Sequence, residues 1–267
     1  MTTLSRLYVG AFLALLSAPL IVAFGVSLNE KRVLFFPPQG LSLGWYQELL
    51  FHPDWRLALI TSLGVAAGAA VVALSVALPI AYMLWRYNMR YARVLFSLGL
   101  MPFALPPVIT AIGMLSFWAE IGWTGRPVNL IIGHGVFMVT LPMVMISLGL
   151  ESINREQLEA AETLGATRQH VLTTVILPQI RPYIFSGMIF VVVFSMNEFV
   201  ISFFLGQFHT VTLPVKIVTQ LRSGYSPVVA AAAMFFLLMA IIGFALVARY
   251  GDLPKLLGAE SKNPGAK

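Results

Sequence analysis

Long apolar runs separated by short polar segments dominate the chain. A helix that crosses about 30 Å of hydrocarbon needs roughly twenty apolar residues. Six windows meet this requirement: Leu7–Leu28, Leu57–Trp85, Val94–Trp118, Leu130–Leu150, Tyr183–Leu205 and Val228–Ala248. The runs are continuous and do not alternate with a period of two, so they do not fit the strands of a membrane barrel. The pattern predicts an all-α integral membrane protein with six transmembrane helices in one domain over residues 1–267.

The composition agrees with lipid as the main solvent. Hydrophobic residues make up 58% of the chain and charged residues 10%, whereas a soluble domain carries about a quarter charged residues. The chain has no cysteine, which excludes a disulfide framework and a thiolate metal site. Its net charge of +6 does not indicate a nucleic-acid partner, because the basic residues lie at the ends of apolar runs and form no patch.

The basic residues also predict how the spans are oriented. The first apolar stretch is too long for the h-region of a signal peptide, so we expect it to remain as a span. Six spans place both termini on one side. Of the 17 Lys and Arg residues, six fall on the opposite side: Lys31, Arg32, Arg56, Arg126, Lys216 and Arg222. The remaining eleven lie with the termini, so the positive-inside rule predicts that both termini are cytoplasmic.

Two short motifs within the spans concern helix packing. Gly64 and Gly68 form a G-x-x-x-G spacing that allows a second helix to approach closely, although chance placement in a Gly/Ala-rich helix is the alternative. Pro102, Pro106 and Pro107 interrupt the third window. Proline removes a backbone hydrogen bond and bends a helix, and hydrocarbon does not satisfy the carbonyls so freed. We therefore expect the break to face protein or a water-filled translocation path.

A polar segment, residues 151–182, separates the fourth and fifth windows on the predicted cytoplasmic side. Its first half is rich in helix formers, and Gly165 stands where a left-handed C-cap would end the helix. Thr167 is placed to cap a second short helix that ends before Pro178. Spacings of three and four put Leu158, Ala161 and Leu164 on one face, and Val171 and Val175 on another. Amphipathicity alone is more typical of a solvated helical connector than of a binding segment.

The residue pattern of this segment is more specific than its amphipathicity. Glu-Ala-Ala, three residues, Gly, nine residues, a hydrophobic residue, one residue and Leu-Pro resembles the EAA loop of ABC importer permeases. Valine stands where isoleucine is usual in the family pattern. The residues that carry the resemblance are Glu159, Ala160, Ala161, Gly165, Val175, Leu177 and Pro178. The resemblance implies that the loop binds a groove on a cytoplasmic ATPase subunit.

No P-loop sequence G-x-x-x-x-G-K-[ST] occurs in the chain, so it cannot cradle ATP phosphates in that way. The chain is therefore expected to be a transport subunit and not an enzyme. It is expected to hold no cofactor or metal, with ATP and magnesium bound by the partner ATPase. His52, His170 and His209 are too dispersed to suggest a metal site.

The fifth window contains a carboxylate, which is costly in hydrocarbon and therefore faces a bundle interior or a cavity. On a continuous helix Ser195, Glu198 and Ser202 share one face, and Asn197 points about 100° away. These four residues, with Pro106 and Pro107, are candidates for lining the translocation path. Glu198 then has two interpretations: it lines the translocation path and meets a cationic substrate, or it pairs with a basic residue and is structural. Lone polar residues such as His134 and Tyr82 are more typical of satisfied packing.

The resemblance extends over essentially the whole chain. The segments "LSLGWYQELL", "LPPVITAIGM" and "FSMNEFVISFFL" look like those of a spermidine/putrescine-type ABC importer permease. Asn197-Glu198 departs from the acidic pair that the family often has. Related permeases handle opines, aminobutyrate-like compounds, aminophosphonates and ferric iron, and these remain alternatives to a polyamine.

The resemblance also implies an architecture. Two permeases with a type I importer-like fold, usually distinct sister chains, would lie in a bacterial inner membrane with two P-loop ATPases beneath and a periplasmic solute-binding protein above. The loops Asn29–Arg56 and Gly206–Pro227 are candidates for contact with the binding protein, although the first is also apolar enough to lie along the membrane. A channel or secondary transporter that uses Glu198 is the competing class. Such carriers often show matching breaks in two halves, and no convincing partner for the Leu-Pro-Pro break is present.

Overall fold

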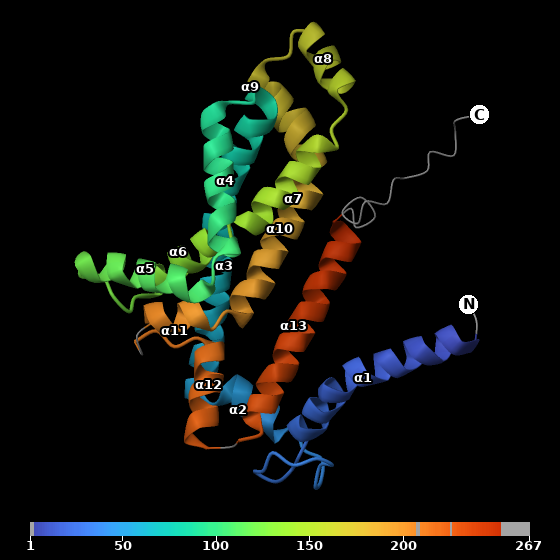
Figure 1. Ribbon diagram of the computed structural model, residues 1–267, viewed down its shortest axis with the longest axis vertical. Coiled ribbons are helices and arrows are strands. Elements are labelled where there is room, and N and C mark those ends of the chain that lie inside the picture. Colours follow the sequence, from blue (N-terminus) through green and yellow to red (C-terminus); the bar gives the residue numbers. More distant parts are fainter. Residues whose placement is uncertain (1–2, 207–208, 225, 252–267) are drawn as a thin grey trace. The chain divides into compact units, whose positions relative to one another are not determined.

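A computed structural model describes residues 3–206, 209–224 and 226–251, and these residues are almost entirely helical (Figure 1). The elements are α1 (Thr3–Ser27), α2 (Gly44–Phe51), α3 (Pro53–Tyr87), α4 (Arg90–Ala104), α5 (Pro107–Glu120), α6 (Pro127–Phe137), α7 (Thr140–Glu151), α8 (Arg155–Thr163), α9 (Arg168–Val171), the π-helical η1 (Leu172–Ile176), α10 (Leu177–Asn197), α11 (Val200–Gly206), α12 (Leu213–Ser223) and α13 (Val228–Tyr250). Within the described part, β structure is limited to an isolated bridge between Asn29 and Leu41. The all-α prediction is confirmed.

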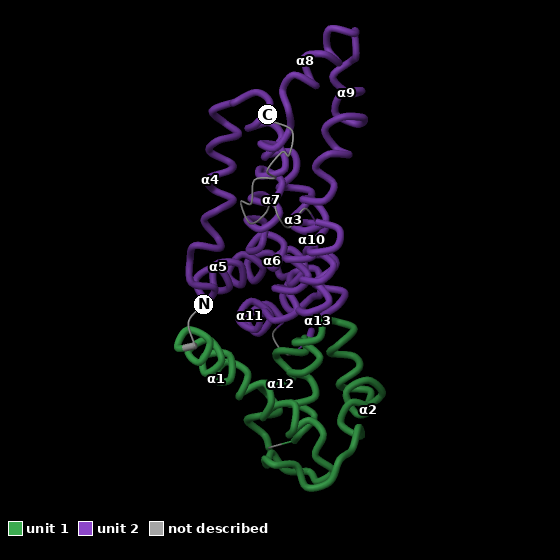
Figure 2. Tube along the Cα trace, turned by 90° about the vertical axis from the view of Figure 1, so that its right-hand side faces the viewer, with its two compact units in different colours: residues 1–61, 211–239 green, residues 62–210, 240–267 purple. Residues whose placement is uncertain are grey.

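The helices fall into two compact units (Figure 2). Unit 1 comprises residues 1–61 and 211–239, and unit 2 comprises residues 62–210 and 240–267. Two of the three boundaries fall inside helices, within α3 and α13, and the third lies between α11 and α12. A single domain over the whole chain stays a prediction.

Four helices are long and apolar enough to cross a membrane: Leu4–Ser27, Pro53–Tyr87, Arg168–Asn197 and Val228–Tyr250. Two further pairs pass the same test together but are bent, α4 with α5 by 110° and α6 with α7 by 44°. Counting each bent pair as one span gives six spans among the described residues. Each of the six predicted windows overlaps one of these spans.

The predicted interruption of the third window is confirmed at residues 105 and 106, but not at Pro102, which lies inside α4. Helix α4 ends where Leu105 N–H donates to the carbonyl of Met101, and α5 begins with Pro106 as its N-cap and Pro107 in its first turn. Proline is tolerated there because the first N–H groups of a helix have no intrahelical partner. Leu105 and Pro106 are exposed, so the residues that the structure describes do not cover the break.

Small residues allow the helices of unit 2 to pack closely. Five buried alanines of α3 lie at or near zero exposure: Ala66, Ala69, Ala70, Ala73 and Ala77. A Cβ built on Gly68 would lie 2.9 Å from a side-chain atom of Ile131 in α6, whereas one built on Gly64 would meet no atom within 4 Å. Only the second glycine of the G-x-x-x-G spacing therefore makes a close helix contact within the described chain.

Helices α7 and α10 run side by side in unit 2 (Figure 1). A Cβ on Gly187 would come within 2.7 Å of the Pro142 Cα, and one on Gly149 within 2.8 Å of the Tyr183 ring. One glycine from each helix thus lets the other helix approach at van der Waals distance. This pair connects the predicted coupling segment to the interior of the unit.

Unit 1 has its own polar contacts. Asn29, fully buried, organises the loop after α1, because its Oδ1 accepts from the N–H groups of Lys31 and Gln39 and its Nδ2 donates to the carbonyl of Val33. Lys216 of α12 pairs with Asp54 at the start of α3, at 3.6 Å. These contacts lie in the two loops predicted to meet a binding protein; residues 207, 208 and 225 of the second loop lie outside the described residues.

Candidate functional sites: the polar loop and the broken fifth span

The polar loop forms the short helix α8, which is capped at both ends. At its start the Asn154 side chain accepts the N–H of Glu156 at 2.9 Å. At its end Gly165 has φ of +82°, a left-handed conformation that favours glycine. The Ala166 N–H donates to the Ala161 carbonyl, and the Gly165 N–H donates to the Glu162 carbonyl, which is the Schellman pattern. The predicted left-handed end of the helix is confirmed.

The second helix of the loop begins as predicted but does not end as predicted. The Thr167 hydroxyl accepts the N–H of His170 and caps α9. The expected stop before Pro178 is wrong, because α9 continues through η1 into α10 and one helical segment spans Arg168–Asn197. Pro178 lies in the first turn of α10.

The π-helical turn explains how proline is accommodated in this helix. Pro178 has no N–H to donate four residues back, and its ring would clash with the carbonyl there. The wider π turn before it relieves that clash. In addition, the hydroxyl of Thr173 donates to the Gln169 carbonyl at 3.0 Å and that of Thr174 to the His170 carbonyl at 2.6 Å. Side chains thus satisfy carbonyls around the irregular turn.

The predicted faces of the loop are correct except at one residue. Leu158, Val171 and Ile176 are buried in one apolar cluster, with Ala161 and Val175 packed against it. Leu164 does not join them, since its side chain is 88% exposed. It is the C-cap of α8, where the backbone turns away from the helical path, so the spacing of three no longer places it on the buried face.

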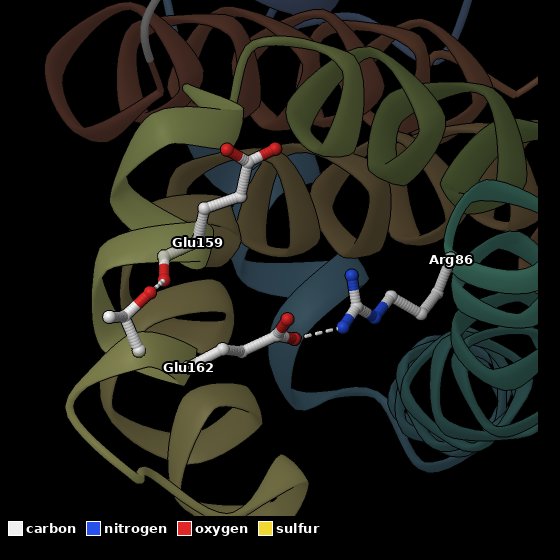
Figure 3. A network of polar contacts seen from close by, with 4 residues as sticks. Arg86, Glu159 and Glu162 are labelled. Atoms are coloured by element: carbon white, nitrogen blue, oxygen red, sulfur yellow. Dashed lines mark hydrogen bonds and ion pairs between the residues drawn. The ribbon is translucent and has the colours of Figure 1, made fainter.

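Two polar contacts attach α8 to the helices beside it. Glu162 forms an ion pair with Arg86 from the last turn of α3 (Figure 3). On the other side Gln179 Nε2, in the first turn of α10, donates to Gln157 Oε1 at 3.2 Å. No local pattern in the sequence marks these four residues as partners. Charged residues four apart on one helix can be paired from sequence, but these partners come from elements that lie far apart along the chain.

The remaining motif residues lie on the outside of the loop. Glu159, Ala160 and Gly165 are exposed, and a Cβ on Gly165 would meet no atom within 4 Å. In Figure 3 the Glu159 carboxylate lies apart from the Arg86–Glu162 pair. Among the described residues the structure records no ion pair for Glu159. With Leu164 these residues form a surface, here called the α8 outer surface, that the described residues leave uncovered.

The fifth window is not one continuous helix. Helix α10 ends at Asn197, residues 198 and 199 are not helical, and α11 begins at Val200. The prediction of a single face shared by Ser195, Glu198 and Ser202 is therefore wrong in its geometry. Asn197 is exposed, and its Nδ2 donates to the Val193 carbonyl at 2.9 Å.

Glu198 sits at this break, and its carboxylate caps α11. Oε1 accepts the N–H of Val200 at 3.1 Å, and Oε2 accepts the N–H of Ile201 at 2.8 Å and is 3.4 Å from that of Ser202. These are N–H groups that a helix start leaves without partners, and negative charge is favourable there. The cap satisfies the carboxylate without a basic side chain. A role for Glu198 in the path stays a prediction.

Ser195 and Ser202 nevertheless meet the same neighbour. The His134 ring of α6 is fully buried, with Nδ1 2.7 Å from the Ser195 hydroxyl and Nε2 3.0 Å from the Ser202 hydroxyl. His134 thus connects the end of α10 to α11 across the break. This agrees with the interpretation of His134 as satisfied packing. Tyr82 packs in the cluster beneath α8, with its ring 6.4 Å from that of Trp85.

Within residues 3–206, 209–224 and 226–251, no group of three or more His, Cys, Asp or Glu side chains is placed to hold a metal ion. The described residues therefore offer two candidate sites. One is the α8 outer surface, and the other is the break between α10 and α11 with its Glu198 cap.

The fold and the loop together define a class: a multi-pass helical permease with an ordered polar helix between its fourth and fifth spans. The model of one family, described as the binding-protein-dependent transport system inner membrane component, matches residues 71–250. The chain belongs to this family and is a permease subunit of an ABC importer.

Relatives and solved structures agree with this assignment. The chain is 28% identical over 234 residues to the spermidine/putrescine transport system permease protein PotC of Haemophilus influenzae, covering 88% of this chain and 90% of that one. It is 31% identical over 237 residues to the putrescine transport system permease protein PotI of Escherichia coli K12, covering 86% and 84%. A bacterial transporter for import of the acidic polysaccharide alginate has a subunit with a similar fold, at a TM-score of 0.69 and 18% identity, covering 92% and 95%.

Proposed function

We propose that this chain is one of two permease subunits of an ATP-driven importer that moves a polyamine from the periplasm to the cytoplasm. The observation that supports coupling to an ATPase subunit is the α8 outer surface. An ordered helix in water exposes Glu159, Ala160 and an 88% exposed Leu164 on one side while its opposite side is packed. An exposed apolar residue beside small residues suits a helix that enters a groove on another protein.

The partners follow from this arrangement. Two cytoplasmic ATPase subunits would bind the α8 outer surfaces of the two permeases and would carry ATP and magnesium, because this chain has no P-loop. The second permease would be a sister chain, and a periplasmic protein would deliver the solute. The proposed location is the inner membrane with both termini in the cytoplasm, as the distribution of Lys and Arg favours.

The polyamine substrate is supported by the relatives named for spermidine and putrescine transport. Identity of this size does not by itself fix a solute, since the molybdenum transport system permease protein ModB of Mycobacterium bovis is 29% identical over 221 residues. An opine, an aminobutyrate-like compound, an aminophosphonate or ferric iron would suit the same class of importer.

The test is transport by the reconstituted complex. The chain is purified together with the ATPase, sister permease and binding protein proposed for its importer and placed in vesicles, with labelled putrescine or spermidine and with molybdate as the control solute. We expect polyamine uptake only with ATP and binding protein. Accumulation by this chain alone without nucleotide would instead indicate a channel or secondary transporter, and uptake of molybdate alone would refute the polyamine assignment.

A further inference from the structure

Helix α8 is held on two different sides. Glu162 contacts Arg86 at the end of α3, and Gln157 contacts Gln179 at the start of α10. Gln157 and Glu162 are five residues apart, which is about 140° around a helix with 3.6 residues per turn. The two contacts therefore leave α8 in different directions, and α8 bridges two membrane-spanning helices instead of hanging from one.

The space between the two contacts is packed. Leu158 is 4% exposed and lies in the same cluster as Ile80 of α3 and Ile180 of α10, with Trp85 packed against it. Close packing transmits displacement, because a well-packed interior has low compressibility. A force applied to the α8 outer surface will therefore reach α10 through Leu158 and the Gln157 contact, and will reach α3 through Leu158 and the ion pair.

Two carboxylates lie near Arg86, and only one of them pairs with it. A depression beside the end of α3 is lined by Trp85, Arg86, Arg155, Leu158, Glu159 and Glu162. Arg86 pairs with Glu162, whereas Glu159 is exposed and its carboxylate lies apart from this pair (Figure 3). Since the Arg86 and Glu162 side chains are 28% and 42% exposed, the pair adds little stability. The importance of the pair is that it links α8 to the end of α3.

We propose that Arg86 and Glu162 are positioning residues that join α8 to α3, so that movement of α8 by the ATPase displaces α3 together with α10. This inference rests on the proposed function. It separates the two acidic residues of "EAAE": Glu159 faces the partner, and Glu162 holds the helix to its own permease. Without the joint, α8 would still bind the ATPase, but its motion would reach the membrane through α10 alone.

The test measures how much solute enters per ATP hydrolysed. The complete reconstituted complex carries Arg86→Glu, Glu162→Arg or both changes, and uptake and ATP hydrolysis are measured in the same vesicles. We expect each single variant to co-purify with the ATPase and to hydrolyse ATP, while uptake per ATP falls roughly tenfold, within the range that coupling residues show. The double variant restores the opposite charges and should recover most of the ratio.

Two further variants keep the test decisive. Glu156→Gln changes an exposed carboxylate on the same helix that has no ion pair among the described residues, and it should leave the ratio unchanged. Glu162→Gln removes the charge without introducing repulsion, so it serves if a reversal does not fold, and it should lower the ratio to a smaller extent.

Several results would contradict the proposal that Arg86 and Glu162 join α8 to α3. They are an unchanged ratio in both single variants, a loss that the double variant does not recover, and loss of ATPase binding in Glu162→Arg, which would place Glu162 on the docking surface. A wild-type complex without ATP-dependent uptake would contradict the proposed function itself, so the two failures are distinguishable.

Discussion

Glu198 shows how a carboxylate can be accommodated within an apolar segment without a cation. Its two oxygens face the first N–H groups of α11, where the helix dipole favours negative charge. The resulting cap also explains why the fifth span is broken, because the side chain satisfies N–H groups that would otherwise belong to a continuing helix. The chemistry of one residue therefore decides the shape of an element.

This role predicts different results for two substitutions of Glu198. Glutamine keeps one acceptor oxygen, so Glu198→Gln should keep α11 in place, whereas Glu198→Ala removes the cap at a cost of about 0.5–2 kcal/mol. We expect a lower melting temperature for the purified alanine variant and a nearly unchanged one for the glutamine variant. Loss of polyamine uptake in Glu198→Gln at unchanged melting temperature would show instead that the charge itself serves the path.

Gly165 gives a second prediction at this scale. Its φ of +82° suits glycine and, less well, asparagine, but not a β-branched residue. Because a side chain there would meet no neighbouring atom, the cost is in the backbone. Gly165→Asn should keep most ATPase binding, and Gly165→Val should lose it by misdirecting Leu164. Pull-down of the ATPase measures this, and equal binding by the two variants would contradict it.

At the scale of elements, the packing of α7 on α10 depends on glycine. A methyl group on Gly187 would approach the Pro142 backbone to 2.7 Å, and backbone cannot move aside as a flexible side chain can. Overpacking of this kind costs about 1–3 kcal/mol. Gly187→Ala should therefore lower the melting temperature of the purified protein clearly.

The matched control is Gly64→Ala, which adds the same methyl group to a helix where no atom lies within 4 Å. Alanine is the better helix former, so stability should be unchanged or slightly higher. If both variants lost stability equally, the loss could not be assigned to the α7–α10 contact.

The sequence predicts elements well where a single local rule decides them. Apolar length located the spans, proline located the α4–α5 break, and Gly165 and Thr167 located the ends of the loop helices. It failed where two local rules compete. Pro178 predicted the end of a helix, but the π turn before it accommodates the proline and the helix continues. The spacing of Ser195, Glu198 and Ser202 predicted that they share one face of a continuous helix, but the helix ends before Glu198, which caps the next one. The contacts of Arg86 with Glu162 and of His134 with two serines join distant segments and leave no local signal.

At the scale of the whole molecule, the orientation in the membrane can be tested directly because the chain has no cysteine. A single cysteine can be placed at Leu164, which is 88% exposed, or at Leu41, which is 75% exposed. With cytoplasmic termini, an impermeant maleimide added to intact spheroplasts should label Leu41→Cys and spare Leu164→Cys until the membrane is opened. The reverse pattern would invert the proposed topology.

The segment from Arg168 to Asn197 contains 30 residues without a break, and at about 1.5 Å per residue it measures roughly 45 Å. A helix of that length would turn a small tilt into a large sideways displacement of its far end. Tilting it by about 10° around the Arg168 end would sweep the Asn197 end sideways by roughly 8 Å, close to the width of a helix. A small displacement applied near Gln179, where α8 contacts this segment, would thus become a larger displacement at the Asn197 end, next to the Glu198 cap.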